Sequence, residues 1–295
     1  MLSASLFSSL PCSGHDATAM AVAEAKNDKG ADLFAVRSLL FLPASNPRAI
    51  DKARKAGADL VVLDLEDAVK SDDKTAARKA AVEAVREVWP MPVAIRINGV
   101  GTKWHSLDLD AVARSKADFA IVPRAISAHL VHGIAEAIGK PVLAMIETAA
   151  GVLGAAQIAN CCAGLVAGTN DLRADLRLPL GATREPISAS LQMIVLAARA
   201  VGIAAFDGVF NGLDDPDGFM REAEEGRRLG FDGKSLIHPN QIAACHQAFA
   251  PSLAEIERAR ALVEAFRGGA ERFGNEMIER MHVEAARRVL DRAAS

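Results

Sequence analysis

Two acidic side chains in the middle of the chain each end an apolar run, and together they could hold a divalent metal ion. The stretch Pro141–Asp175 contains an apolar run ending at Glu147, an Ala-rich segment, and a second apolar run ending at Asp171. Such runs are typical of parallel strands buried on both faces, whose C-terminal ends open onto the ligand-binding surface. Two carboxylates on neighbouring strands, about 5 Å apart, can share one Mg²⁺. Either acid alone could cap a helix or open a loop, but the pair favours a metal site.

Arg96 is the clearest candidate for binding an anion. It lies in the run VAIRING, residues 93–99, where the alternation of strand side chains separates it from its apolar neighbours and directs it into the interior of the predicted sheet. An unpaired guanidinium there would be very costly, so Arg96 needs carboxylates as partners. These could be the protein's own, from Asp64 or Glu66, in an internal ion pair. Alternatively, Arg96 could clamp a substrate carboxylate or a developing enolate oxygen.

Three further acids crowd the end of another apolar run, in the motif LDLEDAV. Asp64, Glu66 and Asp67 would repel one another strongly unless cations lie nearby. Arg96 and a metal ion with its bound water could supply that positive charge. The alternative is that one of these acids caps a helix, which suits Asp67 but not all three. The sequence therefore predicts an acidic cluster beside the metal site.

The elements that must position these residues alternate regularly along the chain. Helical stretches such as Lys74–Val88 and Glu185–Val201 separate the strands, and several end at glycine, a common helix terminator. Eight such units in a row favour a (β/α)₈, or TIM, barrel over a doubly wound sheet, and we place this barrel at residues 34–250. The eight predicted strands are Arg37–Pro43, Leu60–Glu66, Pro92–Asn98, Phe119–Arg124, Pro141–Glu147, Leu165–Asp171, Ile203–Val209 and Gly233–His238.

Residues 251–295 are predicted to form a C-terminal extension made of helices only, Ala254–Phe266 and Asn275–Ala294, with a Gly-Gly break between them. A closed barrel does not need these helices to complete its core. Their apolar stripes must nevertheless be buried against another surface. That surface is either the helix ring of their own barrel or a neighbouring subunit, where the extension could form an interface or cover the active site.

Composition and charge exclude several classes of protein. Lys and Arg total 34 against 37 Asp and Glu, and the formal net charge of −3 argues against general nucleic-acid binding. No apolar run reaches the length of about 18 residues that predicts a membrane span. The four cysteines lack the spacing of a zinc site, and as reduced thiols they predict a cytoplasmic protein.

Residues 1–33 are expected to be a disordered tail or the product of an early start codon. The segment before Pro11 is apolar, but no positive charge precedes its apolar part, which argues against a secretory signal peptide.

The motifs, taken in order, resemble the citrate lyase β-subunit-like (CitE-like) branch of the HpcH/HpaI aldolase/citrate lyase superfamily. The resemblance rests on RSLLFLPASNPR, VVLDLEDAV, RING, MIETAAG, GTNDLRADL and FDGKSLIHPNQI. It implies a (β/α)₈ barrel that binds Mg²⁺ and assembles as a homo-trimer or hexamer. By the same resemblance Glu147 and Asp171 are the metal ligands. The substrate-binding residues that it implies are Arg96, the acidic cluster Asp64, Glu66 and Asp67, and, less directly, Arg37 and Lys234.

The resemblance also implies a carbon–carbon lyase acting on a small molecule, a 3-hydroxyacyl thioester such as citryl-CoA or malyl-CoA. The products would be a 2-oxo acid, oxaloacetate or glyoxylate, and an acyl thioester of CoA or of an acyl carrier protein. Many malyl-CoA lyase-like relatives have a C-terminal motif whose Asp reaches the active site of a neighbouring subunit. In this chain Glu279 stands in that position and the following Pro is missing, so Glu279 is the candidate catalytic acid. Two alternatives stay open: a class II pyruvate-type aldolase acting on free hydroxy-oxo acids, and a non-catalytic metal-binding subunit.

Overall fold

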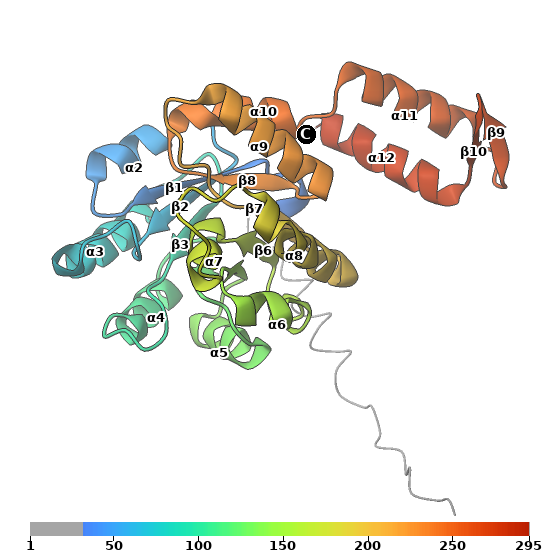
Figure 1. Cartoon of the computed structure of the whole chain (residues 1–295). Coiled ribbons are helices and arrows are strands. Elements are labelled where there is room, and N and C mark those ends of the chain that lie inside the picture. Colours follow the sequence, from blue (N-terminus) through green and yellow to red (C-terminus); the bar gives the residue numbers. More distant parts are fainter. Residues whose placement is uncertain (1–31, 295) are drawn as a thin grey trace, which may run out of the picture.

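The computed structural model describes residues 32–294, and its centre is a closed barrel of eight parallel strands (Figure 1). Each strand pairs with the next along the chain, and β8 pairs with β1 to close the barrel. The predicted (β/α)₈ barrel is confirmed, and each strand lies within or within one residue of its predicted range. The strands are β1 (Ser38–Pro43), β2 (Leu60–Asp64), β3 (Val93–Arg96), β4 (Phe119–Val122), β5 (Val142–Ile146), β6 (Gly164–Ala167), β7 (Ala204–Asp207) and β8 (Gly233–Leu236).

Helices surround the barrel, and the sequence explains where several of them begin and end. Asn46 and Thr148 accept hydrogen bonds at the start of α2 and α6, while glycines in the left-handed conformation end α5, α8 and α9. The helices are α2 (Pro47–Ala53), α3 (Lys74–Ala84), α4 (His105–Ala113), α5 (Ala128–Ile138), α6 (Ala149–Ala159), α7 (Thr169–Asp175), α8 (Ser188–Val201), α9 (Pro216–Leu229) and α10 (Ile242–Phe249), with short 3₁₀ turns η1 (Leu33–Ala35), η2 (Ser71–Asp73), η3 (Glu185–Ile187) and η4 (Pro239–Gln241).

The core has two layers, because alternate strand residues face the barrel interior and the helix ring. In β3, Val93 and Ile95 pack in the outer layer between the barrel wall and the helices, whereas Ala94 packs in the inner layer. Large side chains such as Phe119 and Phe206 fill the interior below the mouth. The side chains of β3 therefore alternate as predicted. Arg96, the last residue of the strand, points into the barrel interior above the apolar side chains of the inner layer.

The C-terminal extension differs from the prediction, because two antiparallel strands separate its helices. The chain continues as α11 (Leu253–Ala265), β9 (Glu271–Phe273), β10 (Glu276–Ile278) and α12 (Arg280–Ala294). Phe273 pairs with Glu276 across the two-residue loop Gly274-Asn275, and Gly274 has φ +63°. A two-residue hairpin loop requires such a conformation, which glycine adopts without strain, so the hairpin starts where a helix was expected.

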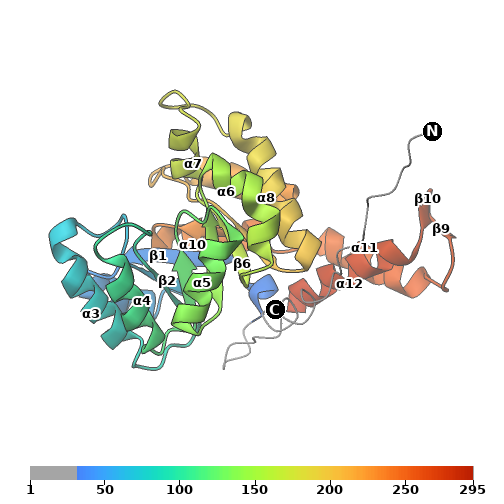
Figure 2. The same cartoon turned by 90° about the horizontal axis from the view of Figure 1, so that it is seen from below.

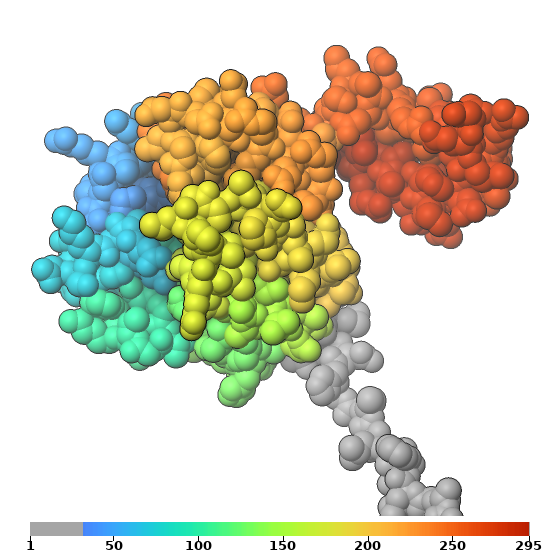
Figure 3. All heavy atoms as spheres, in the orientation of Figure 1, coloured from blue at the N-terminus to red at the C-terminus, as the bar shows by residue number. Residues whose placement is uncertain are grey.

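This extension, which we call the arm, projects from the side of the barrel (Figures 1 and 2). Its helices α11 and α12 pack on each other around Leu262, Ile278 and Val283, so the apolar stripes are buried within the arm itself. The end of α12 returns to the barrel, where Arg292 donates hydrogen bonds to the carbonyls of Phe34 and Phe249. The space-filling view shows the arm as a separate lobe (Figure 3). Within residues 32–294 the structure has no helix with the length and apolar character needed to cross a bilayer.

Candidate functional site

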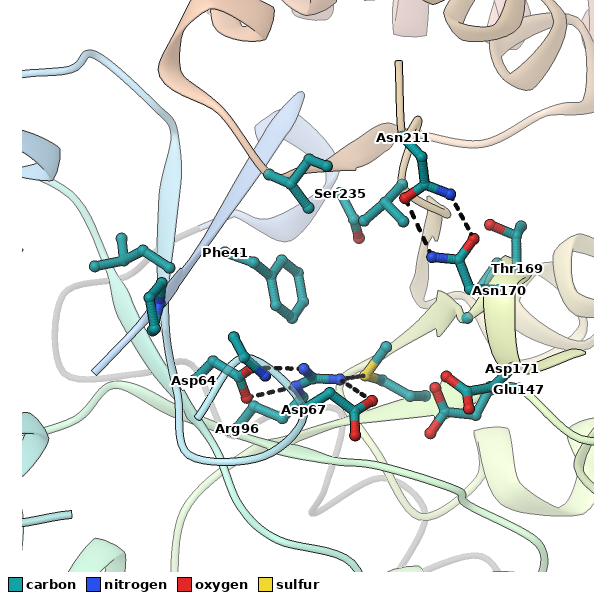
Figure 4. A pocket seen from close by; sticks show the side chains of 18 residues that line it. Phe41, Asp64, Asp67, Arg96, Glu147, Thr169, Asn170, Asp171, Asn211 and Ser235 are labelled. Atoms are coloured by element: carbon teal, nitrogen blue, oxygen red, sulfur yellow. Dashed lines mark hydrogen bonds and ion pairs between the residues drawn. The ribbon is translucent and has the colours of Figure 1, made fainter. Parts of the chain in front are cut away.

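A cavity of about 380 Å³ opens at the C-terminal ends of the barrel strands (Figure 4). One side of the cavity carries the charged side chains Arg96, Asp64, Asp67, Glu147 and Asp171. The other side carries the uncharged polar side chains Asn170, Asn211 and Ser235. The remaining lining is mostly apolar: Phe41, Leu42, Pro43, Ala68, Met145, Ala167, Val209 and Ile237. The mouth therefore combines a charged floor with apolar walls, an arrangement suited to a small anionic ligand that carries an apolar portion.

Glu147 follows β5 directly and points into this cavity. It does not cap the next helix, because the hydroxyl of Thr148 accepts the N–H of Gly151 at 3.0 Å and takes that role. Glu147 is only 2% exposed, and its Oε1 accepts the backbone N–H of Arg124 at 2.6 Å. Gly168 leaves the space that Glu147 needs, since a Cβ on this glycine would lie 2.4 Å from Oε2. The backbone on both sides therefore holds Glu147 in one orientation.

Asp171 lies beside Glu147 but comes from a helix and not from a strand end. The strand β6 stops at Ala167, and Asp171 is in the first turn of α7 (Figure 4). Its side chain is about 40% exposed, and the Nη1 atom of Arg124 lies 3.9 Å from its Oδ1. The sequence prediction placed the acid in the correct cavity while assigning it to the wrong element, because the short turn at Gly168 starts the helix early.

The two acids share an environment that disfavours negative charge. Burial raises the pKa of Glu147 to about 7; the Arg124 N–H opposes this shift, and the nearby charge of Asp171 reinforces it. Burial also raises the pKa of Asp171, with Asp67 adding to the effect. A cation between the two carboxylates would relieve this repulsion, so the donors fit a hard divalent ion. No group of three potential metal-binding side chains occurs in residues 32–294. A metal ion here would therefore keep positions for water and substrate, as Mg²⁺ usually does.

Arg96 is paired with the protein's own acids, which was one of the two alternatives. Its Nε and Nη2 atoms donate to the two carboxylate oxygens of Asp64 at 2.7 and 2.6 Å, and Nη1 lies 2.8 Å from Glu66. Asp64 also accepts the backbone N–H groups of Glu66 and Ala68, which shapes the loop after β2. The guanidinium lines the cavity and faces the ring of Phe41 at 5.5 Å. The ion pair fixes its position without removing it from the mouth.

Glu66 and Asp67 complete the predicted acidic cluster but differ in environment. Burial raises the pKa of Glu66 to about 8 against the opposing charge of Arg96, with Asp67 and Glu147 adding to the rise. The Asp67 side chain is 67% exposed and lines the cavity. The raised pKa of Glu66 and the positive charge of Arg96 both reduce the repulsion expected from the sequence.

Arg37 and Lys234 require a correction, because the structure does not bring them to this cavity. Arg37 precedes β1 at the opposite end of the barrel, where its Nε lies 3.9 Å from Asp59. Lys234 is fully buried on the outer face of β8, and its Nζ contacts Asp207 at 2.9 Å and Glu222 at 2.8 Å. Strand alternation turns Ser235 inward in its place. Neither cation can bind a substrate held in the mouth.

Glu279 follows β10, and Figure 1 places β10 at the tip of the arm, away from its own barrel mouth. Its backbone N–H donates to Nδ1 of His282, and its side chain is exposed. Any part for Glu279 in this chemistry therefore requires a second copy of the chain.

Three residues of the site were not selected from the sequence. Arg124 follows β4 and contacts both acids, which its place at the end of a predicted strand could have indicated. Asn170 and Asn211 form a reciprocal pair of side-chain hydrogen bonds at 3.2 and 2.8 Å on the cavity wall (Figure 4). Asn170 adjoins Asp171, but Asn211 comes from a loop after β7 and nothing in its sequence surroundings marks it.

The fold and the site together define a (β/α)₈-barrel protein with two neighbouring carboxylates and an arginine held by an ion pair at its mouth. The family model HpcH/HpaI aldolase/citrate lyase matches residues 37–239. The chain therefore belongs to the HpcH/HpaI aldolase/citrate lyase family, and the resemblance noted in its motifs is confirmed.

Known proteins of this family are similar over most of the chain. A (3S)-malyl-CoA thioesterase of Cereibacter sphaeroides is 40% identical over 269 residues, covering 87% of this chain and 94% of the relative. The citrate lyase subunit beta of Leuconostoc mesenteroides is 34% identical over 277 residues, covering 86% and 92%. The solved structure of CitE from Mycobacterium tuberculosis in complex with magnesium, acetoacetate and coenzyme A has a TM-score of 0.79 at 34% identity, covering 89% of this chain and all of that one.

Proposed function

We propose that this protein is a Mg²⁺-dependent carbon–carbon lyase that cleaves a 3-hydroxyacyl thioester such as malyl-CoA or citryl-CoA. The observation that carries the proposal is the pairing of buried Glu147 with Asp171 in one cavity that Arg96 also lines. The citrate lyase subunits among the relatives, and the CitE structure with magnesium and coenzyme A, support this choice of metal and substrate class.

Glu147 and Asp171 would hold the metal ion. When bound, Mg²⁺ would act as a Lewis acid toward the substrate oxygen that becomes the new carbonyl oxygen of the 2-oxo acid. Glu147 is pre-oriented for this task by the Arg124 N–H, so little reorganisation is needed when the ion binds. Asp171 is more exposed and therefore gives the ion and its ligand a route to the site.

The cleavage itself needs a proton removed from the 3-hydroxyl, after which the bond between C2 and C3 breaks. The electron pair of that bond moves into the thioester, forming an enolate that takes up one proton at carbon. The products are a 2-oxo acid and the shortened acyl thioester, so atoms and charge balance. Arg96 would stabilise the enolate oxygen or hold the substrate carboxylate, because its guanidinium is fixed at the cavity floor by Asp64. Asp67 would bind the substrate hydroxyl, since it lines the same cavity.

Glu279 would contribute from a second copy of the chain in a homo-oligomer. The support is its place at the tip of a projecting arm, together with exposed Met277 and Met281 on either side of it. These methionines, about 63% and 62% exposed, offer the apolar contact that a neighbouring barrel could bury.

Thioester hydrolysis is the second candidate, and one observation favours it specifically. The relatives that are 40% identical are named (3S)-malyl-CoA thioesterases. The same metal and arginine would then bind the acyl group while water attacks the thioester carbonyl and releases the free thiol and the hydroxy acid.

Product analysis separates the two candidates. We would incubate the full-length protein and Mg²⁺ with malyl-CoA and citryl-CoA, with matched free hydroxy-oxo acids, and with an EDTA control, and identify products by mass spectrometry. A lyase gives a 2-oxo acid and acetyl-CoA, whereas a thioesterase gives the hydroxy acid and CoA. Cleavage of only the free acids would indicate the aldolase alternative. Turnover of none of them would contradict the proposal and favour a non-catalytic metal-binding subunit.

A further inference from the structure

Arg124 occupies an unusual backbone conformation at the edge of the metal site. Its φ is +49°, in the left-handed region that residues other than glycine rarely adopt. Among residues 32–294, Arg177 is the other non-glycine residue with positive φ. A strained residue persists only where its surroundings determine its conformation, and such residues gather at functional sites.

Contacts of the neighbouring residues with β5 and α6 fix the backbone conformation of Arg124. The next residue, Ala125, donates its N–H to the carbonyl of Met145 on β5 at 3.0 Å. On the other side α6 approaches so closely that a Cβ on Gly151 would lie 2.6 Å from the Ala125 carbonyl oxygen. The loop after β4 is thus clamped between β5 and α6. This clamp holds the Arg124 N–H against Glu147 at 2.6 Å.

The side chain of Arg124 faces the second acid. Its Nη1 is 3.9 Å from Asp171 Oδ1, which is too far for a hydrogen bond but close for two charges, and the side chain is 55% exposed. Arg96, by contrast, is engaged by Asp64 and Glu66 through short contacts. Arg124 therefore acts on Asp171 through its charge without a hydrogen bond to it, and Arg96 acts on the same carboxylate more weakly.

We propose that Arg124 is a positioning residue of the metal site, where its backbone fixes Glu147 and its guanidinium weakens the affinity for a bare divalent cation. A cation bound to Asp171 would lie well within one Debye length of that guanidinium, and the two positive charges repel each other. A divalent cation bound to a dianionic chelating ligand forms a complex with no net charge, and this complex avoids the repulsion. Arg124 therefore makes the site take its metal together with the substrate anion. This inference rests on the proposed assignment of Glu147 and Asp171 as metal ligands.

Metal-binding measurements on three variants test the inference. Arg124→Gln removes the charge, Arg124→Lys keeps it, and Arg124→Gly removes it while relieving the backbone strain. We would titrate Mn²⁺ into each full-length protein, followed by electron paramagnetic resonance and by calorimetry. The Gln and Gly variants should bind Mn²⁺ about three- to tenfold more tightly than the wild type. The Lys variant should stay within about twofold of the wild type. The Gly variant should also melt at a higher temperature than the Gln variant.

Oxalate, a dianionic chelator, supplies the control for charge. In saturating oxalate the Mn²⁺ affinities of the wild type and Arg124→Gln should become equal, because the bound complex carries no net charge. Equal or weaker affinity of Arg124→Gln without oxalate would overturn the inference, as would a difference that persists with oxalate. Failure of the wild type to bind Mn²⁺ even in saturating oxalate would overturn the proposed metal site as well. Tight wild-type binding that Arg124→Gln leaves unchanged would remove only the role of Arg124.

Discussion

Replacing Arg96 with lysine should show whether its guanidinium acts on the substrate or only forms a structural ion pair. The substitution keeps the positive charge at the cavity floor but removes the planar fork. In the structure that fork reaches both oxygens of Asp64, at 2.7 and 2.6 Å, while its third nitrogen lies 2.8 Å from Glu66. A lysine ammonium on a thinner stem cannot reproduce this set of contacts.

The structure gives the size of the effect. Loss of one charged hydrogen bond in a buried site costs about 1.5–3 kcal/mol, so Arg96→Lys should lower the free energy of unfolding by roughly this amount. The lysine ammonium should also stabilise the negative charge of the transition state less well than the guanidinium does. We expect kcat/KM to fall at least about tenfold, which corresponds to about 1.4 kcal/mol.

The assay is steady-state kinetics on the thioester that the product analysis identifies, combined with chemical denaturation. Arg78→Lys is the matched control, because Arg78 pairs with Asp108 at 2.5 Å with similar burial but outside the cavity. Arg78→Lys should lose stability without losing kcat/KM in the folded protein. An unchanged kcat/KM in Arg96→Lys would show that Arg96 is only a structural ion-pair partner, and our account of the cavity floor would be wrong.

Three further predictions concern the metal, the buried charges and the arm. Glu147→Gln should weaken Mg²⁺ binding by more than about 100-fold in calorimetry, since even outer partners of metal ligands contribute 10–100-fold; near-normal affinity would remove Glu147 from the metal site. Burial opposes ionisation of Asp207, but Lys234 and Arg184 outweigh it and lower its pKa. The stability that ionised Asp207 contributes to the folded protein is therefore fully present above its unfolded pKa of about 3.9. That contribution is lost as the pH falls through the lowered pKa of the folded state. Asp207→Asn should cost about 3–5 kcal/mol at pH 7 in urea denaturation and less near pH 3, and a cost independent of pH would contradict this. Truncation after Ala250 should lower the oligomeric mass measured by light scattering and abolish turnover; retention of both would exclude the interface role of the arm.

The barrel could be predicted because its signals are local and repeated. Apolar runs bounded by polar ends predict each strand, and the glycines after the helices mark where the chain turns back. The same local reasoning failed at Asp171, where a longer strand was expected. Gly168 lets the chain pass close to Glu147 and start α7 within two residues of the strand, and that close approach depends on a contact with another strand.

The errors at the site come from contacts between segments distant in the sequence. Lys234 lies in a predicted strand, but only the register of β8 against β1 and β7 determines that it faces the helices. The Gly274-Asn275 loop is typical of a hairpin, but the helical pattern that follows it favours a helix beginning at Asn275. Asn211 contacts Asn170 on the same cavity wall from a separate loop, and such a pair can be found only once the chain is folded.

The most direct test of the account is a crystal structure of the full-length protein with Mn²⁺, using anomalous scattering to locate the ion. We predict one strong peak between the carboxylates of Glu147 and Asp171, at roughly 2.1 Å from an oxygen of each. Occupied sites elsewhere with no peak in this cavity at saturating Mn²⁺ would contradict the claim. So would a separation of more than about 8 Å between the two carboxylates, since one ion could not then contact both.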